Sequence, residues 1–299
     1  MKQLAPFDTV KEETNNTRRV SLKELWVPLS GAKAQQRRVE TIANNVANAN
    51  TTAFKKDQAV FKEHLTAYEK GTDIDLPNKE WAPEDFYRSY GAEKAHVKVD
   101  GTYTKFTQGQ ISPTNNPFDI ALEGKGFIEV LSPNGIRYTR KGNLYLNNEG
   151  ELVTDGGNRV LSSLVIPEGT PEERQAALEN APDPKDRVIR VSNQPLNINQ
   201  KGELHQQGNL VGKISIVEFK DLTALQKEGN SVFVNKSVDN RADKSSTLVH
   251  QGSLELSNVN PIQEMSKLIQ AHRQLESIQR VIKTYDNMAG KAYNEIAKF

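Results

Sequence analysis

The 299-residue sequence contains no cysteine, which excludes disulfide bonds, thiolate catalysis and cysteine-ligated zinc sites. It also contains no run of 18 apolar residues, so no membrane-spanning helix is predicted. Residues 1–20 are polar, with basic residues at Lys11, Arg18 and Arg19 but without the apolar core of a Sec signal peptide. We therefore expect that any export from the cytoplasm uses another route.

An excess of charge of either sign is also missing. The 39 basic and 38 acidic residues nearly cancel, giving a net charge of +1, so neither a nucleic acid nor an anionic membrane is predicted as a partner. A hydrophobic content of 36% is enough for one or two domains with a real core. The mean hydropathy of -0.66 leaves room for segments that fold only with a partner.

Residues that could carry chemistry are few and scattered. Gly124-Lys125-Gly126 lacks the spacing of a phosphate-binding loop and precedes a strand, so a tight turn is the favoured interpretation. Asp119 and Glu123 could form an acid/base pair, but a charged turn before a strand explains them as well. The histidines lie far apart in the sequence, at His64, His96, His205, His250 and His272. We predict no catalytic residue, no metal ligand, no cofactor and no small-molecule substrate.

An amphipathic helix is predicted near the start of the chain. Apolar or small residues recur at alternating spacings of three and four, which is the seam pattern of a coiled-coil-like helix. Pro28 and Gly31 interrupt the early part, so the helix is expected to begin near Ser30 as its N-cap and to end at 48–50. The residues of this stripe are Leu22, Leu25, Leu29, Ala32, Val39, Ala43 and Val46, with Gln36 between them.

Asparagines cluster at the end of this helix, at Asn44, Asn45, Asn48 and Asn50. They are compatible with two interpretations. Asparagine side chains compete with the helix for backbone hydrogen bonds, so the cluster is typical of a fraying helix end. Their amides could instead bond neighbouring chains and specify register, as a polar seam residue does in a coiled coil. The composition alone leaves both open.

A second, longer helix is predicted at the carboxyl terminus. Asn260 is a suitable N-cap, Pro261 suits the first helical position and Glu264 lies in the first turn. A helix of about 35 residues with one narrow apolar stripe is not stable alone in water, so it requires a partner. The stripe consists of Met265, Leu268, His272, Leu275, Ile278, Ile282, Tyr285, Ala289, Ala292 and Ile296.

The middle of the chain is predicted to be β-rich. A hairpin is expected from strands at 127–131 and 136–140 around the turn Ser132-Pro133-Asn134-Gly135. Short strands at this spacing suggest an antiparallel barrel or sandwich. Further strands are predicted at 144–146, 152–154, 188–191, 196–198, 213–219 and 232–234. The insertion near 167–187 contains a capping box, Thr170-Pro171-Glu172-Glu173, which predicts a short helix ending before Pro182.

Three ordered segments resemble the signatures of flagellar rod and hook proteins. Residues 30–36 and 42–55 are similar to that family's amino-terminal pattern, SGMxAQQ followed by ANNLANxNTxGFK. Residues 116–127, with 138–142 and 150–154, resemble its central β-domain motif, and 252–260, with 264–265 and 281–284, resemble its carboxyl-terminal helix signature. Ala32 replaces the usual Met, and Ala53 replaces the usual Gly, which argues against a positive φ at that position.

This resemblance implies a structural subunit of the bacterial flagellar basal-body rod. Such a subunit would be exported through the flagellar type III apparatus, without a cleaved Sec signal, and stacked into a helical tube in the cell envelope that transmits motor torque. Its partners would be copies of itself, other axial proteins of the rod and hook-basal body, the export apparatus and the rings around the rod. Residues 258–261 and 282–286 look more like the proximal-rod member lettered F than the distal-rod member lettered G. The alternatives are that distal-rod or another axial subunit, and a module that binds an envelope polymer.

The predicted fold class is α+β, with terminal helices paired in a coiled-coil-like stem and a central antiparallel β domain. The expected regions are a disordered leader at 1–20, a helix and extended segment at 21–65, an irregular arm at 66–110, the β domain at 111–251 and the second helix at 252–299. We expect 1–60 and 255–299 to order only on assembly. The candidate assembly residues are Gln35, Gln36, Val39, Ile42, Asn44, Asn45, Val46, Asn48, Asn50, Phe54, Asn258, Asn260, Met265, Leu268, His272, Leu275, Ile278, Ile282 and Tyr285.

Overall fold

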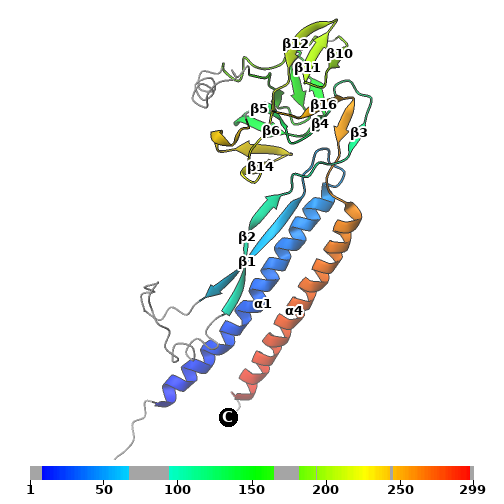
Figure 1. The fold of residues 1–299 in the computed structure, drawn as a ribbon. Helices are drawn as coiled ribbons and strands as arrows, with labels where there is room; N and C mark the ends of the chain where they lie inside the picture. The colour runs from blue at the N-terminus through cyan, green and yellow to red at the C-terminus, as the bar shows by residue number, and fades with distance from the viewer. Residues whose placement is uncertain (1–8, 67–93, 165–181, 193, 243–244, 297–299) are drawn as a thin grey trace, which may run out of the picture. The chain divides into compact units, whose positions relative to one another are not determined.

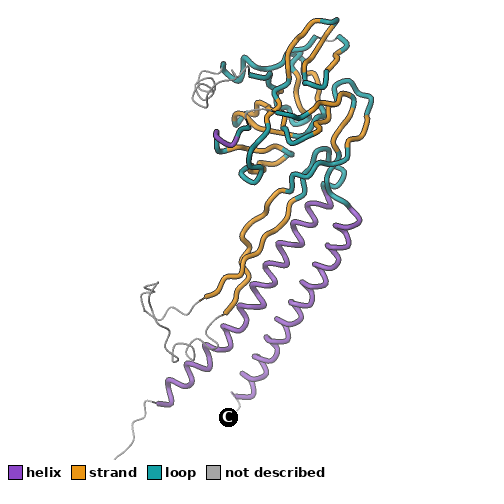
Figure 2. The backbone as a smooth tube through the Cα atoms, in the orientation of Figure 1, coloured by secondary structure: helices purple, strands orange, loops and turns teal. Residues whose placement is uncertain are grey.

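The computed structural model describes residues 9–66, 94–164, 182–192, 194–242 and 245–296 (Figure 1). The chain divides into two compact units. Unit 1 consists of Met1–Asn44, Gln58–Tyr103 and Ile262–Phe299, and unit 2 consists of Asn45–Asp57 and Thr104–Pro261. Nearly all of the two long helices, drawn in purple in Figure 2, belongs to unit 1, whereas unit 2 is built mainly from short strands and loops.

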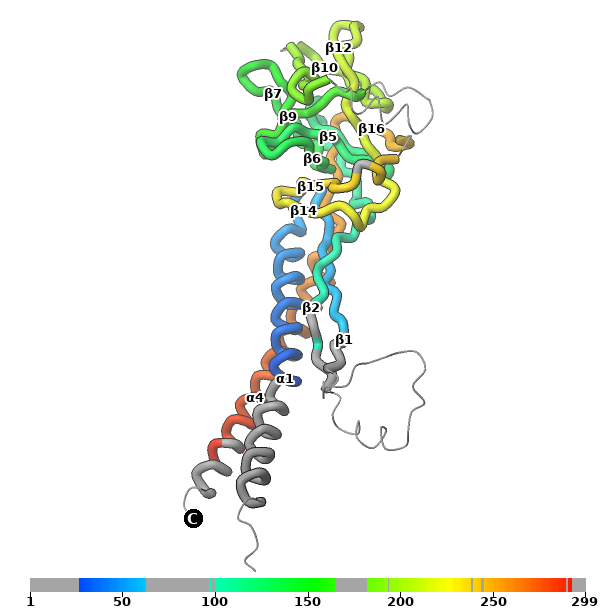
Figure 3. Tube along the Cα trace, turned by 90° about the vertical axis from the view of Figure 1, so that its left-hand side faces the viewer, coloured from blue at the N-terminus to red at the C-terminus, as the bar shows by residue number. Residues whose placement is uncertain are grey.

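Two long helices, α1 (Thr9–Ala47) and α4 (Pro261–Ile296), run alongside each other in unit 1 (Figures 1 and 3). The start of α4 at Pro261 confirms the prediction. The predicted start of the first helix near Ser30 is wrong, because α1 continues through Pro28 to Thr9. The Ser30 hydroxyl does not cap a helix start but donates to the carbonyl of Val27 at 2.8 Å, as serine does inside a helix.

Residues 9–20 of the predicted leader are therefore helical, and residues 1–8 lie outside the described residues. No helix in the described ranges combines the length and the apolar content that a bilayer crossing requires.

A two-stranded ribbon completes unit 1. Its strands are β1 (Asp57–Thr66) and β2 (Lys94–Thr104), so part of the predicted irregular arm is a regular strand, and residues 67–93 lie outside the described residues. The side chain of Lys62 pairs with Asp100 at 2.8 Å across the ribbon. The strand was missed because ribbon side chains such as Val97, 42% exposed, do not produce a clear buried face in the sequence.

Unit 2 is an antiparallel β domain made of several sheets. The largest sheet has eight strands, in the order β14-β15-β6-β5-β9-β8-β7, with β13 paired to β5. Its strands are β5 (Phe127–Ser132), β6 (Gly135–Thr139), β7 (Leu144–Leu146), β8 (Leu152–Thr154), β9 (Arg159–Val160), β13 (Ile216–Val217), β14 (Leu225–Gly229) and β15 (Val232–Asn235).

Three smaller sheets and a short helix complete unit 2. The three-stranded sheet has the order β10-β11-β12, and two pairs, β16-β4 and β17-β3, join the start of the domain to its end. These elements are β3 (Ile111–Pro113), β4 (Ile120–Glu123), β10 (Leu196–Ile198), β11 (Glu203–Gln206), β12 (Asn209–Lys213), η1 (Val238–Asn240), β16 (Leu248–Gln251) and β17 (Ser253–Glu255).

The α+β class and the hairpin are confirmed, but the barrel alternative is wrong. Strands β5 and β6 pair from Ile128↔Thr139 to Ser132↔Gly135, which closes the predicted turn. Among the described strands, the path of the large sheet runs from β14 to β7 and does not return on itself. Closure needs a continuous staggered ladder around the sheet, and strands of only two or three residues, such as β9, do not provide it.

Two other strand predictions are corrected. Residues 188–191 form the isolated bridges Leu161↔Val188 and Glu151↔Arg190 rather than a strand, and only Ile216–Val217 of the predicted 213–219 strand forms β13. The short helix predicted from the capping box at 170–173 falls within 165–181, outside the described residues.

The core of unit 2 has two parts, each built from alternate strand residues. A cluster of aromatic rings surrounds Phe127, which contacts the rings of Phe106, Phe219 and Phe233 in edge-on arrangements. A larger aliphatic cluster is formed by Ile120, Leu122, Ile128, Val130, Leu144, Leu152, Val160, Ile189, Val191, Leu196, Ile198, Leu204, Ile214 and Val249.

Candidate functional site

No catalytic constellation is present among the described residues. No three His, Cys, Asp or Glu side chains in the described ranges gather as metal ligands would. The residues that the sequence marked out instead fall on the two helices and on the segments where the chain passes between the units.

The least exposed line of α4 follows the predicted stripe only in part. Leu268, Leu275, Ile278 and Ile282 are half-buried, as a helix seam requires. The line continues through Ala271, which is 1% exposed, because the steps from 268 to 271 and from 271 to 275 keep the spacing of three and four.

Three predicted stripe residues face elsewhere. Met265 is 52% exposed, Tyr285 is 42% exposed, and His272 is also exposed. Glu264, rather than Met265, occupies the seam position in the first turn and is 2% exposed, with Lys267 bonded to its carboxylate at 2.8 Å. Sequence reasoning shifted the stripe by one residue at both 264/265 and 271/272, because it preferred the larger side chain at each step.

On α1, the predicted residues are distributed in a similar way. Ile42 is 7% exposed, Val39 and Val46 are half-buried, and Gln36 is exposed. The side chain of Gln35 donates a hydrogen bond to the side-chain oxygen of Gln274 on α4. This bond is a direct contact between the two helices within unit 1.

Asn45 is not available to a neighbouring chain. Its amide group donates to the carbonyl of Asp57 at 2.8 Å, and its side-chain oxygen accepts from the N–H of the same residue at 3.0 Å. The side chain thereby imitates a strand partner for Asp57, and Asn45 is 1% exposed. Asn48 accepts a bond from the Thr51 hydroxyl at 3.2 Å, and Asn44 and Asn50 are exposed. The fraying and interchain interpretations therefore both fail for Asn45.

Asn258 likewise works within the chain. Its oxygen accepts from the N–H of Lys56 at 2.8 Å, and its amide donates to the carbonyls of Lys105 at 2.8 Å and Thr107 at 3.0 Å. One side chain thus joins three segments that are distant in sequence. Asn260, two residues later, is exposed.

The expectation for Ala53 is wrong, because this residue has a φ of 54°. Its N–H donates to the carbonyl of Glu255 at 2.8 Å, and its side chain is 1% exposed. The left-handed conformation costs an alanine about 1–2 kcal/mol, so the turn is held by its surroundings. The glycine of the family pattern would adopt the same turn without that strain.

Phe54 and Lys227 hold the next residues of the turn against β14. Phe54 is 4% exposed, and the ammonium of Lys227 lies 4.0 Å from the centre of its ring. The same ammonium pairs with the carboxylate of Asp57 at 2.9 Å and donates to the carbonyl of Lys55 at 3.2 Å. Phe54 is therefore a packing residue within unit 2.

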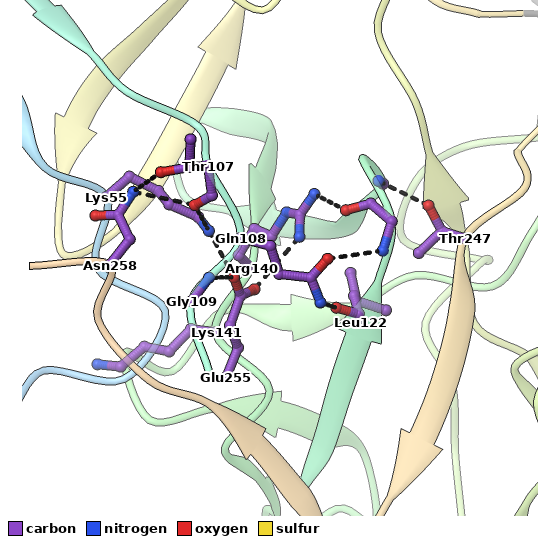
Figure 4. A network of polar contacts seen from close by, with 12 residues as sticks. Lys55, Thr107, Gln108, Gly109, Leu122, Arg140, Lys141, Thr247, Glu255 and Asn258 are labelled. Carbon is purple, nitrogen blue, oxygen red and sulfur yellow. Dashed lines mark hydrogen bonds and ion pairs between the residues drawn. The ribbon is translucent and has the colours of Figure 1, made fainter. Parts of the chain in front are cut away.

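A buried group of three charges lies at the centre of this region (Figure 4). The side chains of Lys55 and Glu255 are 0% exposed and that of Arg140 is 2% exposed. One carboxylate oxygen of Glu255 lies 2.6 Å from the ammonium of Lys55, and the other lies 3.3 Å from the guanidinium of Arg140. The N–H of Gly109 also donates to Glu255, at 2.8 Å, and the Lys55 ammonium donates to the carbonyl of Thr107 at 2.9 Å. We call Lys55, Arg140 and Glu255 the buried triad.

The triad carries two cations and one anion. Burial lowers the pKa of the Lys55 ammonium from its ordinary value of 10.5, and this effect exceeds the opposing attraction to Glu255. The pKa of the Arg140 guanidinium is lowered for the same reason. The guanidinium carbon of Arg140 also lies 5.0 Å from the centre of the Phe127 ring, a favourable position for a cation. Glu255 is thus the carboxylate that makes both buried cations tolerable.

The glycine loop at 124–126 is part of the same network and not a phosphate site. Its Gly124 N–H donates to the side chain of Gln108 at 3.2 Å, and its Gly126 N–H donates to the hydroxyl of Thr247 at 2.8 Å. The carbonyl of Gly124 accepts a hydrogen bond from the guanidinium of Arg140. The amide groups of Gly124 and Gly126 are therefore already bonded within the chain, which favours the interpretation of this loop as a tight turn.

The sequence did not predict the buried triad, although Lys55 lies within the amino-terminal motif and Glu255 within the carboxyl-terminal motif that resemble the family. A signal was present only at Glu255, a charged residue between Leu254 and Leu256, whereas Lys55 is followed by the charged residues Lys56 and Asp57. Such a residue is recognised as buried only when its partner is known, and Lys55 and Glu255 are 200 residues apart. The triad joins the segment after α1 to the segment before α4, both within unit 2.

Three family models match the chain. The model described as flagella basal body rod protein matches residues 27–55, the flagellar hook protein FlgE/F/G D1 domain matches 121–206, and the flagellar basal body rod FlgEFG protein C-terminal matches 250–295. Each of the three matched regions contributes one residue to the buried triad, in the order Lys55, Arg140 and Glu255.

Curated relatives match along nearly their whole length. The flagellar basal-body rod protein FlgG of Borreliella burgdorferi is 33% identical over 282 residues, covering 91% of this chain and 98% of the relative. The rod protein FlgF of Caulobacter vibrioides is 30% identical, covering 92% and 98%. The hook-basal body complex protein FlhO of Bacillus subtilis is 28% identical, covering 93% and 99%. The chain therefore belongs to the flagellar basal-body rod protein family, as a structural subunit of the basal body and not an enzyme.

Proposed function

We propose that this subunit polymerises through its terminal helices into a helical tube that transmits motor torque. Family membership implies assembly with other rod and hook-basal-body proteins. The observation that carries the proposal is the division of α4 into one half-buried line and apolar residues that stay exposed, such as Ile262 at 76% and Ile269 at 55%. An exposed apolar surface on a long helix marks a contact with another chain.

The predicted assembly residues take three roles in this proposal. Leu268, Leu275, Ile278 and Ile282 pair α4 with α1 along the half-buried line, as in a coiled coil, together with Gln35, Val39, Ile42 and Val46 of α1. The exposed residues Gln36, Met265, His272 and Tyr285 contact neighbouring subunits. Asn45, Phe54 and Asn258 serve assembly only indirectly, by holding the turn from which each helix departs.

The buried triad suits the transmission of torque. A load carried from one helix to the other passes through the residues after α1 and before α4, which the triad and the Asn45 and Asn258 bonds fix to the same β domain. Charge-assisted hydrogen bonds are short and directional, so they resist displacement better than apolar contacts do. We propose that this group keeps the two departure points at a constant separation under load.

A seam substitution tests the proposal directly. Leu275→Asp places a carboxylate on the half-buried line, so we expect a folded β domain, no incorporation into rods and no motility. Ser277→Asp is the matched control, because Ser277 is exposed on the same turn of α4, and we expect it to assemble. Motility can be scored in soft agar and incorporation by isolating basal bodies. Normal motility of Leu275→Asp would contradict helical pairing.

The place of the subunit in the rod, its export and its other partners are also proposals. We propose a proximal-rod position, on the basis of residues 258–261 and 282–286, although relatives named FlgG and FlgF match the chain to a similar degree. Export through the flagellar type III apparatus to the cell-envelope part of the rod, and contact with the surrounding rings, are supported by family membership. Immunogold labelling of rods arrested before distal-rod addition tests the position: labelled arrested rods are expected.

A further inference from the structure

The exposed apolar residues of α4 form two separate groups rather than one stripe. The proximal patch consists of Ile262, Met265 and Ile269, which are 76%, 52% and 55% exposed. The distal patch consists of Val281, Tyr285 and Met288, which are 45%, 42% and 52% exposed. Figure 1 shows α4 as one uninterrupted helix.

The two patches lie on opposite flanks of α4. At about 100° of rotation per residue, the proximal patch is centred roughly 130° to one side of the half-buried line, and the distal patch roughly 90° to the other side. No single helix can cover the half-buried line and both patches, because its contact extends over about one face. Each patch therefore needs its own partner.

The patches are also displaced along the helix. Their central residues, Met265 and Tyr285, are separated by 20 positions, which corresponds to about 30 Å at a rise of 1.5 Å per residue. When two parallel copies of α4 lie side by side, the flank of one copy that carries the proximal patch faces the flank of the other copy that carries the distal patch. The apolar residues on these flanks meet only when one copy is shifted along the axis by this distance.

We propose that the proximal patch of one subunit packs against the distal patch of a second copy, with the two α4 helices parallel and displaced by about 30 Å. This inference rests on the proposed function and specifies its geometry. A contact between different patches of identical chains leaves one patch free at each end, so it continues indefinitely and builds an open filament. A contact of the proximal patch with itself would instead close a dimer.

The size of the patches favours a polymer contact over an isolated dimer. Three side chains on each partner bury far less than the roughly 1,200–2,000 Å² of a stable two-chain interface. One such contact does not hold two free subunits together. In an array each subunit uses both patches, and the contacts of neighbouring subunits add to them. The monomer therefore stays dispersed until it is delivered to a growing end.

The charges on α4 favour the displaced arrangement. In an unshifted parallel pair, each basic residue, such as Lys267 or Arg273, lies at the height of the same residue in the other copy. A shift of 20 positions places Lys267 level with Asn287 and Arg273 level with residue 293, a tyrosine. Like charges no longer face each other at equal height, which removes a repulsion that a long parallel contact would otherwise repeat.

Cysteine crosslinking tests the displacement, because the natural chain has no cysteine to interfere. The full-length variant Met265→Cys/Tyr285→Cys replaces the natural chain in cells, and isolated rods are oxidised and analysed by non-reducing electrophoresis. We expect a ladder of dimers, trimers and longer species. The matched control is Met265→Cys/Ser277→Cys, whose second cysteine is exposed but about 12 Å too near the first along the helix, and we expect no ladder.

Each outcome decides a separate point. Rods that form without a ladder in either Met265→Cys/Tyr285→Cys or the second pair, Ile269→Cys/Met288→Cys, overturn the displaced contact but leave helical assembly standing. Dimers from Met265→Cys alone indicate a contact of the proximal patch with itself and also overturn it. Absence of even the natural chain from isolated rods overturns the proposed function, and the inference with it.

Discussion

Glu255→Gln is expected to destabilise the β domain severely while changing its shape very little. Glutamine has nearly the same size as glutamate, but it removes the one negative charge of the buried triad. Lys55 and Arg140, whose side chains are 0% and 2% exposed, then remain as two buried cations without the carboxylate that contacts them both. Leaving a buried charge without its partner costs about 3–5 kcal/mol.

This loss is large compared with the total stability of a domain, about 5–15 kcal/mol. For a domain of 150–250 residues, each kcal/mol lowers the melting temperature by about 2–4 °C, so Glu255→Gln should lower it by about 6–20 °C. Urea unfolding followed by circular dichroism measures the free energy of unfolding. Glu123→Gln is the matched control, because its side chain is 57% exposed and its pairing with His250 lies at the surface.

Removing one of the two unpaired cations should restore part of the stability that Glu255→Gln loses. The variant Lys55→Met/Glu255→Gln replaces the buried ammonium by an apolar chain of similar length, so we expect it to be more stable than Glu255→Gln alone. The coupling energy between the two substitutions should fall at about 0.5–3 kcal/mol, the range found for residues in one network. Strictly additive effects of Lys55→Met and Glu255→Gln would refute the view that their charges interact.

The dependence on pH gives a second check. The pKa of Lys55 in the folded chain lies below its ordinary 10.5, so the unfolded chain holds this proton more tightly. Stability therefore rises with pH between the folded pKa and 10.5. Glu255→Gln removes the attraction that opposes the effect of burial, so the pKa falls further and the window widens downward. The stability deficit of the variant should therefore shrink as the pH rises toward 10.5, and a constant deficit would contradict this account.

Three further results are expected. In the free subunit, amide exchange should be slow at 45–57 and 252–260, because unit 2 holds these segments in place. It should be fast along α4 beyond Ala271. Uniformly slow exchange along α4 would contradict the expectation that this helix orders on assembly. Ala53→Gly should change the free energy of unfolding by about 1 kcal/mol or less. Ala53→Val should lower it by about 1–3 kcal/mol, because φ is 54° at this position. Equal free energies for the two variants would count against a strained turn. Asn45→Ala leaves the N–H and carbonyl of Asp57 without their partner, so it should lower the free energy of unfolding by about 1–3 kcal/mol, measured by thermal unfolding. The exposed control Asn50→Ala should not have this effect. If the two variants were equally stable, these two bonds would contribute nothing to stability.

The start of α4 and the hairpin followed from local patterns because their causes are local, whereas the start of α1 did not. Pro261 after Asn260 defines the start of α4, and the turn 132–135 joins the two strands of the hairpin. The buried line of α4 could be predicted only to within one residue at 264/265 and 271/272. A partner selects the face that it covers, and size alone favoured Met265 and His272 over Glu264 and Ala271.

The sequence by itself determined the α+β class, the two terminal helices and, through its motifs, the family. Each of these depends on interactions between residues a few positions apart, or on patterns that stay in the chain whatever its fold. Only the tertiary structure decided that Lys55 and Glu255 meet 200 residues apart, that Ala53 takes a left-handed turn, and that Asn45 and Asn258 bond within the chain. Those contacts depend on how distant segments are brought together, and no local spacing encodes that.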